Sequence, residues 1–271
     1  MRHHSYRNII LTAAAALPLI VSGVVSGPAF GEEKKPEASD LPAFLTTESP
    51  FDLSVTLSGL TDYVSLRGYS QTARDPALQA TVEASYGDFS VGFFAANVHF
   101  GTSEPKIEFD PFVAYRTSYE NWSLDLTYYY YTYQDAKDSD YPEFFHSLSY
   151  NFDDLATVTG TFAYASDYFG QSDTGYFYKG AVSVPLPNDF TFSGSVGYQD
   201  FAEGKFVRHW VWDAGVSYAL GEAITLDVRY HDTDIDEDVN CTGGAFQCGA
   251  TIVGKVSVAT SLSAIRKRFQ D

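Results

Sequence analysis

The sequence is poor in positive charge. Its 271 residues contain 17 Lys and Arg against 35 Asp and Glu, which gives a formal net charge of −18 at pH 7. A surface this acidic repels phosphates instead of displacing their counterions, so a protein that binds duplex nucleic acid is excluded. We therefore expect no nucleic-acid partner.

Long apolar runs are missing after the N-terminus. No stretch of roughly 18 or more apolar residues occurs there, which excludes a bundle of membrane-spanning helices. The chain nevertheless contains 20 Tyr, 21 Phe and 21 Gly, whereas a disordered acidic chain is poor in aromatic residues. A β-rich globular protein and a transmembrane β-barrel remain.

The N-terminus has the layout of a secretory signal peptide. Arg2 and Arg7 precede an apolar stretch over residues 9–27, and AFG at 29–31 offers a cleavage site of small residues. A membrane anchor is the alternative. The many Ala, Gly and Pro residues of this stretch favour a leader that is removed.

The domain organisation that follows is simple. We expect residues 1–31 to be the signal peptide, residues 32–50 to be a flexible periplasmic tail, and residues 51–271 to form one outer-membrane β-barrel. The mixture of charge, Pro and Ser in residues 32–50 shows neither a helical nor a strand period.

From the end of this tail onward, apolar and polar residues alternate in segments of nearly constant length. Trp122 and Leu124 fall on one side of such a segment, and Ser123 and Asp125 fall on the other. This is the period of a strand with two different faces. The pattern predicts twelve strands, over residues 51–70, 77–86, 89–100, 107–119, 122–133, 143–152, 157–166, 175–185, 190–198, 206–218, 223–231 and 250–262.

The faces of these strands distinguish two β architectures. A soluble sandwich or lipocalin-like barrel also alternates, but its outward face must be charged. Here the polar face is rich in Ser, Thr and Gly with single charges, the apolar face is continuous, and aromatic residues gather at the segment ends. Tight turns also alternate with longer loops. These features predict an all-β fold, a transmembrane antiparallel up-and-down β-barrel of about 12 strands.

A family resemblance points the same way. TDYVSLRGYSQT at residues 61–72, followed by DPALQATVEASY at 75–86 and VGFFAANVHFG at 91–101, resembles the opening of the TorF-type porin family, and the similarity extends over residues 61–131. The sequence departs from the family pattern at Phe94 and Ala96, where the family usually has Trp and Ser. The resemblance implies an outer-membrane barrel with a porin function and identifies no solute.

An apolar exterior places the charged side chains of the strands in the lumen, where a charge costs little. The predicted pore-lining residues are Arg67, Glu83, Glu108, Asp110, Arg116, Asp125, Lys179, Asp213, Asp227, Arg229 and Lys255, with His209 on the same face. Twelve strands lie between barrels filled by side chains and wide open porins. We expect a narrow polar lumen that passes small hydrophilic solutes, with weak selectivity for cations or neutral molecules because carboxylates outnumber basic groups. A closed barrel that serves structure or surface binding is the alternative.

Arg67 allows two interpretations. It could project into the lumen as a fixed cation opposite Glu83 on the neighbouring strand. Alternatively, Gly59 and Gly68 could bend the first strand, so that the motif merely closes the barrel against strand twelve, and this second interpretation is slightly favoured.

The remaining candidate sites give weaker signals. Cys241 and Cys248 are the only cysteines, and an exported chain favours a disulfide between them over a metal site. The acidic run DTDIDED at 232–238 lacks the Gly and the terminal Glu of a calcium loop, so we expect neither a metal nor a cofactor.

No catalytic arrangement is predicted. His146 and Ser147 are adjacent in a strand, so their side chains point to opposite faces and cannot pair directly. We therefore do not expect an enzyme. The expected location is the outer membrane of a Gram-negative bacterium, and the expected partners are outer-membrane lipid and lipopolysaccharide, the barrel-assembly machinery and small polar solutes.

Overall fold

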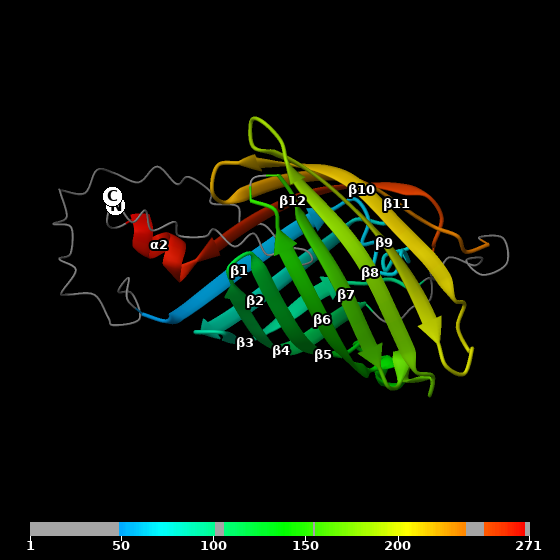
Figure 1. Cartoon of the computed structure of the whole chain (residues 1–271). Helices are drawn as coiled ribbons and strands as arrows, with labels where there is room; N and C mark the ends of the chain where they lie inside the picture. The colour runs from blue at the N-terminus through cyan, green and yellow to red at the C-terminus, as the bar shows by residue number, and fades with distance from the viewer. Residues whose placement is uncertain (1–48, 101–105, 154, 237–246, 269–271) are drawn as a thin grey trace, which may run out of the picture.

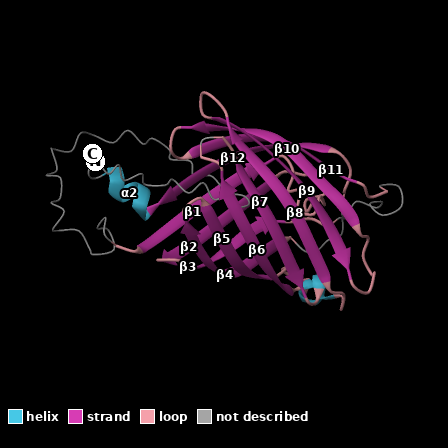
Figure 2. Ribbon diagram, in the orientation of Figure 1, coloured by secondary structure: helices cyan, strands magenta, loops and turns pink. Residues whose placement is uncertain are grey.

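The computed structural model describes residues 49–100, 106–153, 155–236 and 247–268. In this part of the chain, twelve antiparallel strands follow one another around a closed barrel, and the last strand pairs with the first. Figures 1 and 2 show the tilted strands wrapped into one barrel. The predicted closed up-and-down barrel is confirmed.

The strands are nine to thirteen residues long. They are β1 (Phe51–Leu60), β2 (Ala77–Tyr86), β3 (Phe89–Asn97), β4 (Ile107–Tyr119), β5 (Trp122–Tyr131), β6 (Tyr141–Asn151), β7 (Thr157–Ala165), β8 (Gly175–Pro185), β9 (Phe190–Phe201), β10 (His209–Leu220), β11 (Ile224–Thr233) and β12 (Thr251–Ser261). Two short 3-10 helices, η3 (Lys137–Ser139) and η4 (Tyr168–Gly170), and a helix α2 (Leu262–Arg268) complete the described elements.

Closure joins Ser54–Leu60 of β1 to Lys255–Ser261 of β12 in antiparallel register. An open sheet in hydrocarbon would leave the N–H and C=O groups of its two edges without partners, and this pairing removes both edges. The connections alternate in length around the barrel. We call the end with the longer connections, such as 61–76 and 166–174, the loop end, and the end with short turns such as 87–88 and 120–121 the turn end.

The outer face of the barrel is apolar. Leu78, Val113, Leu148, Val228 and Ile252 lie exposed on five different strands. At the turn end, outward aromatic rings pair across neighbouring strands, as in Trp122–Tyr150 and Phe190–Tyr218, whose ring centroids are 4.8 and 4.7 Å apart. An apolar band bordered by aromatic rings is the exterior that a membrane-spanning barrel presents to lipid.

The predicted first strand, residues 51–70, is wrong beyond Leu60. β1 ends there, and residues 61–76, which we call the inner segment, fold away from the wall into the barrel. Gly68 has a φ of +83°, a left-handed conformation that a strand does not contain. The other predicted strands differ from the observed ones at their ends only.

The loop end of the barrel is filled by a cluster of aromatic side chains. Its buried members are Val98, Phe100, Tyr133, Tyr141, Ala165, Tyr168 and Phe201, and Tyr63 of the inner segment packs against them. These residues come from the ends of strands and from four different connections. At the loop end, apolar side chains therefore pack against one another inside the barrel, in addition to those that cover its outer face.

Helix α2 follows the last strand and lies beside the start of β1. The side chain of Asp52 accepts hydrogen bonds from the backbone N–H and the hydroxyl of Ser263, at 2.9 and 2.7 Å, and Arg266 donates to the carbonyl oxygen of Phe51 at 2.8 Å. None of the described helices is both long and apolar enough to cross a membrane.

Replacement of Val228 by Arg tests the orientation of the outer face. Val228 is 60% exposed near the middle of β11, so the variant should lose about 2–4 kcal/mol of folding free energy in a bilayer, because a charge at the midplane loses its hydration. Urea titration of the barrel refolded into phospholipid vesicles measures this loss. The matched variant Val228→Leu should fold as the wild type does. An Arg variant as stable as the Leu variant would contradict a lipid-facing exterior.

Candidate functional site in the barrel lumen

The strand register identifies the inner face of every strand. Residues directly opposite each other in a sheet share a face, and the pairs Ser54–Glu83, Arg116–Asp125 and Asp227–Lys255 carry this identity between neighbouring strands. Arg67 of the inner segment contacts Glu143 on β6 and Gln199 on β9, which fixes that face as the interior. All ten predicted lumen residues that lie on strands share it.

The inner segment crosses the lumen. It leaves the barrel wall between β1 and β2, yet its tip contacts β6, β9 and β10, each three or more strands away in either direction around the barrel. Arg67 Nε donates to Gln199 Oε1 at 2.7 Å, and the carbonyl oxygen of Arg67 lies 2.9 Å from His209 Nε2. The segment therefore narrows the lumen at the loop end.

Arg67 is the main anchor of this segment. Its side chain is buried and forms an ion pair with the buried carboxylate of Glu143, while the rings of Tyr168 and Phe177 lie 5.2 and 5.1 Å from its guanidinium carbon. Burial alone lowers the pKa of Arg67, but the carboxylate of Glu143 and the hydroxyl of Tyr168 raise it above its ordinary value. The guanidinium therefore stays charged and is held by one carboxylate, one amide and two aromatic faces.

Gly68, beside this anchor, fits tightly against the opposite wall. A Cβ at this position would lie 2.3 Å from Thr233 Cγ2 and 3.0 Å from Val211 Cγ2, on β11 and β10. Together with the left-handed backbone, this close approach requires glycine.

A first group of charges lies on the wall formed by β2 to β5. Arg116 Nε is 2.6 Å from Asp125 Oδ2, and its Nη1 pairs with Glu83 and lies 3.2 Å from the hydroxyl of Ser90. We call these four residues the Arg116 cluster. The side chains of its charged residues keep 21–32% of their surface accessible, so this part of the lumen is open to water.

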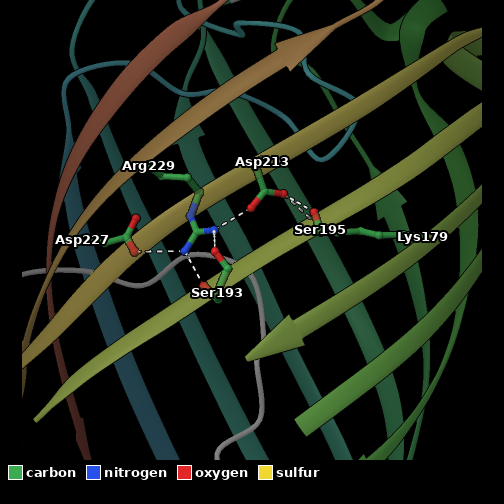
Figure 3. Close-up of polar contacts among 6 residues, drawn as sticks. All are labelled: Lys179, Ser193, Ser195, Asp213, Asp227 and Arg229. Carbon is green, nitrogen blue, oxygen red and sulfur yellow. Dashed lines mark hydrogen bonds and ion pairs between the residues drawn. The ribbon is translucent and has the colours of Figure 1, made fainter. Parts of the chain in front are cut away.

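A second group lies on the opposite wall, since β4 and β10 are six strands apart in both directions. Figure 3 shows Arg229 between two carboxylates. Its Nη1 is 2.5 Å from Asp213 Oδ1, its Nη2 is 3.1 Å from Asp227 Oδ2, and Lys179 Nζ is 3.7 Å from Asp213 Oδ2. Ser193 and Ser195 complete this group, the Arg229 cluster, through hydrogen bonds to Arg229 and Asp213.

Three of the ten predicted lumen residues on strands lie outside both clusters. Lys255 faces Asp227 across the β11–β12 pairing. Glu108 and Asp110 lie on β4 near the loop end, where both are buried. Neither forms an ion pair with Lys or Arg in the described part of the chain.

Sequence reasoning brought Glu83, Arg116 and Asp125 to one face correctly but assigned the wrong partner to Arg67. Glu83 pairs with Arg116, and Arg67 reaches Glu143 instead. The favoured interpretation, in which the motif around Arg67 closes the barrel against strand twelve, is also wrong, because β1 makes that contact. Glu143 was missed, although the alternation of its own strand places it on the inner face with Ser147 and Ser149.

The remaining predictions from the sequence concern the two cysteines, His146 with Ser147, and a metal site. Cys248 is buried, but Cys241 lies outside the described residues, so the disulfide stays a prediction. His146 is exposed on the outer face, whereas the hydroxyl of Ser147 lies 2.9 Å from that of Thr161 on the inner face, as the alternation predicted. In the described residues, no group of three or more His, Cys, Asp or Glu side chains could hold a metal ion.

A shallow depression of about 700 Å³ lies on the barrel wall. Leu148, Phe162 and Val196 line it on the outer face, and Gly160 and Gly180, paired across β7 and β8, lie on its floor with nothing within 4 Å of a Cβ built on either. In a bilayer, acyl chains would fill such an apolar hollow.

The chain belongs to the Gcw_chp family, described as a bacterial protein of unknown function, whose model matches residues 45–262. Among curated proteins, none matches the sequence.

Solved structures show the same architecture. The NanC porin is 12% identical with a TM-score of 0.54 over 76% of this chain and 98% of its own. The KdgM porin is 8% identical with a TM-score of 0.51 over 77% of this chain and 97% of its own. At these identities the likeness establishes the fold alone, which is that of a closed antiparallel β-barrel.

A double-mutant cycle on Arg67 and Glu143 tests the anchor of the inner segment. Either Arg67→Met or Glu143→Met alone should cost about 3–5 kcal/mol of folding free energy, because each leaves a buried charge without its partner. The double variant should recover most of this loss, since no unpaired charge remains. Urea unfolding of the four proteins in detergent micelles measures the coupling. Additive losses would show that the two residues do not interact.

Proposed function

We propose that this protein is an outer-membrane channel that lets small hydrophilic solutes diffuse through a narrow polar lumen. One observation carries the proposal: a closed barrel with an apolar exterior encloses two charged clusters whose side chains are still partly accessible inside it. Charged groups in a wet interior serve permeation, whereas a barrel built only as a scaffold gains more from an apolar filling.

Two further observations support a porin. NanC and KdgM, whose barrels resemble this one, are porins by name. Residues 61–131 also resemble the TorF-type porins. The same proposal includes the location, which is the outer membrane of a Gram-negative bacterium, reached after export by a signal peptide at residues 1–31. It also includes lipopolysaccharide and the barrel-assembly machinery as partners.

The inner segment determines how wide the channel is. Twelve strands enclose a narrower lumen than the sixteen or more of large porins, and residues 61–76 reduce it further at the loop end. The expected channel has a small conductance that depends on the position of this segment. Solutes the size of hydrated ions and small polar metabolites fit such a lumen better than oligomers.

The charge of the lumen favours cations over anions. In both clusters the basic groups are paired with carboxylates, so neither presents a row of uncompensated positive charge to an anion. Glu108 and Asp110 add negative charge at the loop end. An acidic entrance raises the local concentration of cations and repels anions.

A closed barrel that serves structure or surface binding is the second candidate. The aromatic cluster and the inner segment, which together occupy the loop end of the lumen, favour it. Ion conductance in planar lipid bilayers separates the two candidates, because a closed barrel gives no single-channel steps.

Substitutions that release the inner segment should enlarge the channel. Arg67→Met removes the anchor, and Gly68→Val forces the tip away from Thr233 and Val211 without changing any charge. Both variants should conduct more than the wild type in symmetrical KCl, by about twofold or more if the segment is the narrowest point of the pore. Single-channel recording in planar bilayers measures this.

The control for this experiment is Arg74→Met, which removes the same charge from the exposed part of the same segment. It should conduct as the wild type does. Equal conductance in all four proteins would contradict a constriction by residues 61–76, and a wild type and variants without conductance would favour the closed barrel.

A further inference from the structure

Two carboxylates at the loop end of the lumen lack a counter-charge. Glu108 and Asp110 lie two residues apart on the inner face of β4 and are 2% and 1% exposed. The described residues place no Lys or Arg in an ion pair with either one. Two ionised carboxylates buried side by side repel each other and have lost their hydration, so such a pair takes up either a proton or a cation.

The groups around this pair are rich in oxygen. The hydroxyl of Tyr133 donates to Glu108 Oε1 at 3.1 Å, and Tyr63 of the inner segment packs against the aromatic cluster that contains Tyr133. The backbone N–H of Thr132 donates to Asp110 Oδ1 at 3.2 Å. These bonds satisfy one oxygen of each carboxylate, and Glu108 Oε2 is buried without a partner.

A neighbouring amide provides the second, independent observation. Gln79 on β2 is 3% exposed, and neither Oε1 nor Nε2 of its side chain has a hydrogen-bond partner in the described part of the chain. Register places Gln79 opposite Ala96, and Ala96 opposite Glu108, all on the inner face. Strands lie about 4.8 Å apart, so the long side chains of Gln79 and Glu108 lie on either side of the short, buried side chain of Ala96.

The oxygen atoms of these side chains and the close packing around them determine which ligand can bind. Carboxylate, amide and phenol oxygens are the ligands that hard inorganic cations prefer, and the aromatic cluster around Tyr133 leaves no room for an organic cation of any size. Because only two carboxylates are available, the site does not reach the three acidic or imidazole ligands of a structural metal centre. A bound cation would therefore exchange readily.

We propose that Glu108, Asp110 and Gln79 form a binding site for a hard inorganic cation at the loop end of the lumen. This proposal deepens the proposed function and, as an entry site for a channel, rests on it. A cation that enters the lumen exchanges its hydration shell for these oxygens. Binding itself does not require conduction, so the two proposals fail separately.

Thermal unfolding of the full chain in detergent micelles tests the site. The wild type is titrated with CaCl2 and, in a second series, with KCl. N-methylglucamine chloride keeps the ionic strength constant, because that organic cation is too large to fit between Gln79 and Glu108. The Tm should rise by about 5 °C or more in at least one series, at a cation concentration about 100-fold above the dissociation constant.

Two variants locate the binding. In E108Q/D110N the rise should disappear, and the Tm without cation should exceed that of the wild type, because two uncompensated charges are gone. The single variant E108Q, which changes the structure least, should lose at least half of the rise. The control D88N/E222Q neutralises two exposed carboxylates at the turn end and should keep the full rise.

Two results would overturn the proposal. A wild type whose Tm is the same in CaCl2, KCl and N-methylglucamine chloride has no such site. An equal rise in the wild type and in E108Q/D110N places the cation elsewhere, for example among the acidic residues 232–238.

Discussion

Closure of the sheet between β1 and β12 is the constraint on which the other features depend. In hydrocarbon no water is available for the N–H and C=O groups of an open edge, so the wall must return to its own first strand. Once the wall is closed, each strand has one face toward lipid and one toward the lumen, and the period of two distributes the side chains between them. The many charged residues of the strands therefore meet in one enclosed space, where they either pair with one another or stay in contact with water.

Charged side chains are accommodated differently in different parts of the lumen. Toward the turn end and at the middle of the barrel, the Arg116 and Arg229 clusters respectively keep part of their surface accessible, so each ion pair costs little desolvation and contributes little stability. Toward the loop end, aromatic packing excludes water, and Arg67 is accommodated only because Glu143, Gln199, Tyr168 and Phe177 surround it. A buried ion pair of this kind adds little net stability but fixes one position strongly, since any displacement of the inner segment exposes both charges to apolar surroundings.

The sequence predicted what depends on local periodicity and missed what depends on a distant partner. Alternation in residues such as Trp122 to Asp125 identifies two faces whatever the neighbouring strand is, so the number of strands and the inward side of Glu83, Arg116 and Asp213 followed from it. Past Leu60 the alternation changes phase, because the apolar residues move from odd positions such as Val55 and Leu57 to even positions such as Val64 and Leu66. This local sign that the strand ends was missed. Gly68 was noted as a bend, but its contacts with Val211 and Thr233 join residues more than 140 positions apart. The pairing of Arg67 with Glu143 also depends on a distant residue. Both Glu83 and Glu143 face inward, and the path of the inner segment determines which of them Arg67 contacts.

The distribution of charge along the lumen bears on where a permeating ion would be discriminated. In the Arg116 and Arg229 clusters, farther from the loop end, acid and base alternate within a few ångströms and their fields largely cancel, and the partial exposure of both clusters screens what remains. At the loop end, Glu108 and Asp110 have no such neighbour and lie among apolar rings, where the effective dielectric constant is lower and the same charge acts more strongly. An ion entering from that end would therefore meet the largest uncompensated potential at the narrowest part of the lumen, beside the segment that narrows it. On the proposed function, selectivity and constriction then depend on neighbouring residues, because Tyr63 of the inner segment packs in the same aromatic cluster as Tyr133, which donates a hydrogen bond to Glu108.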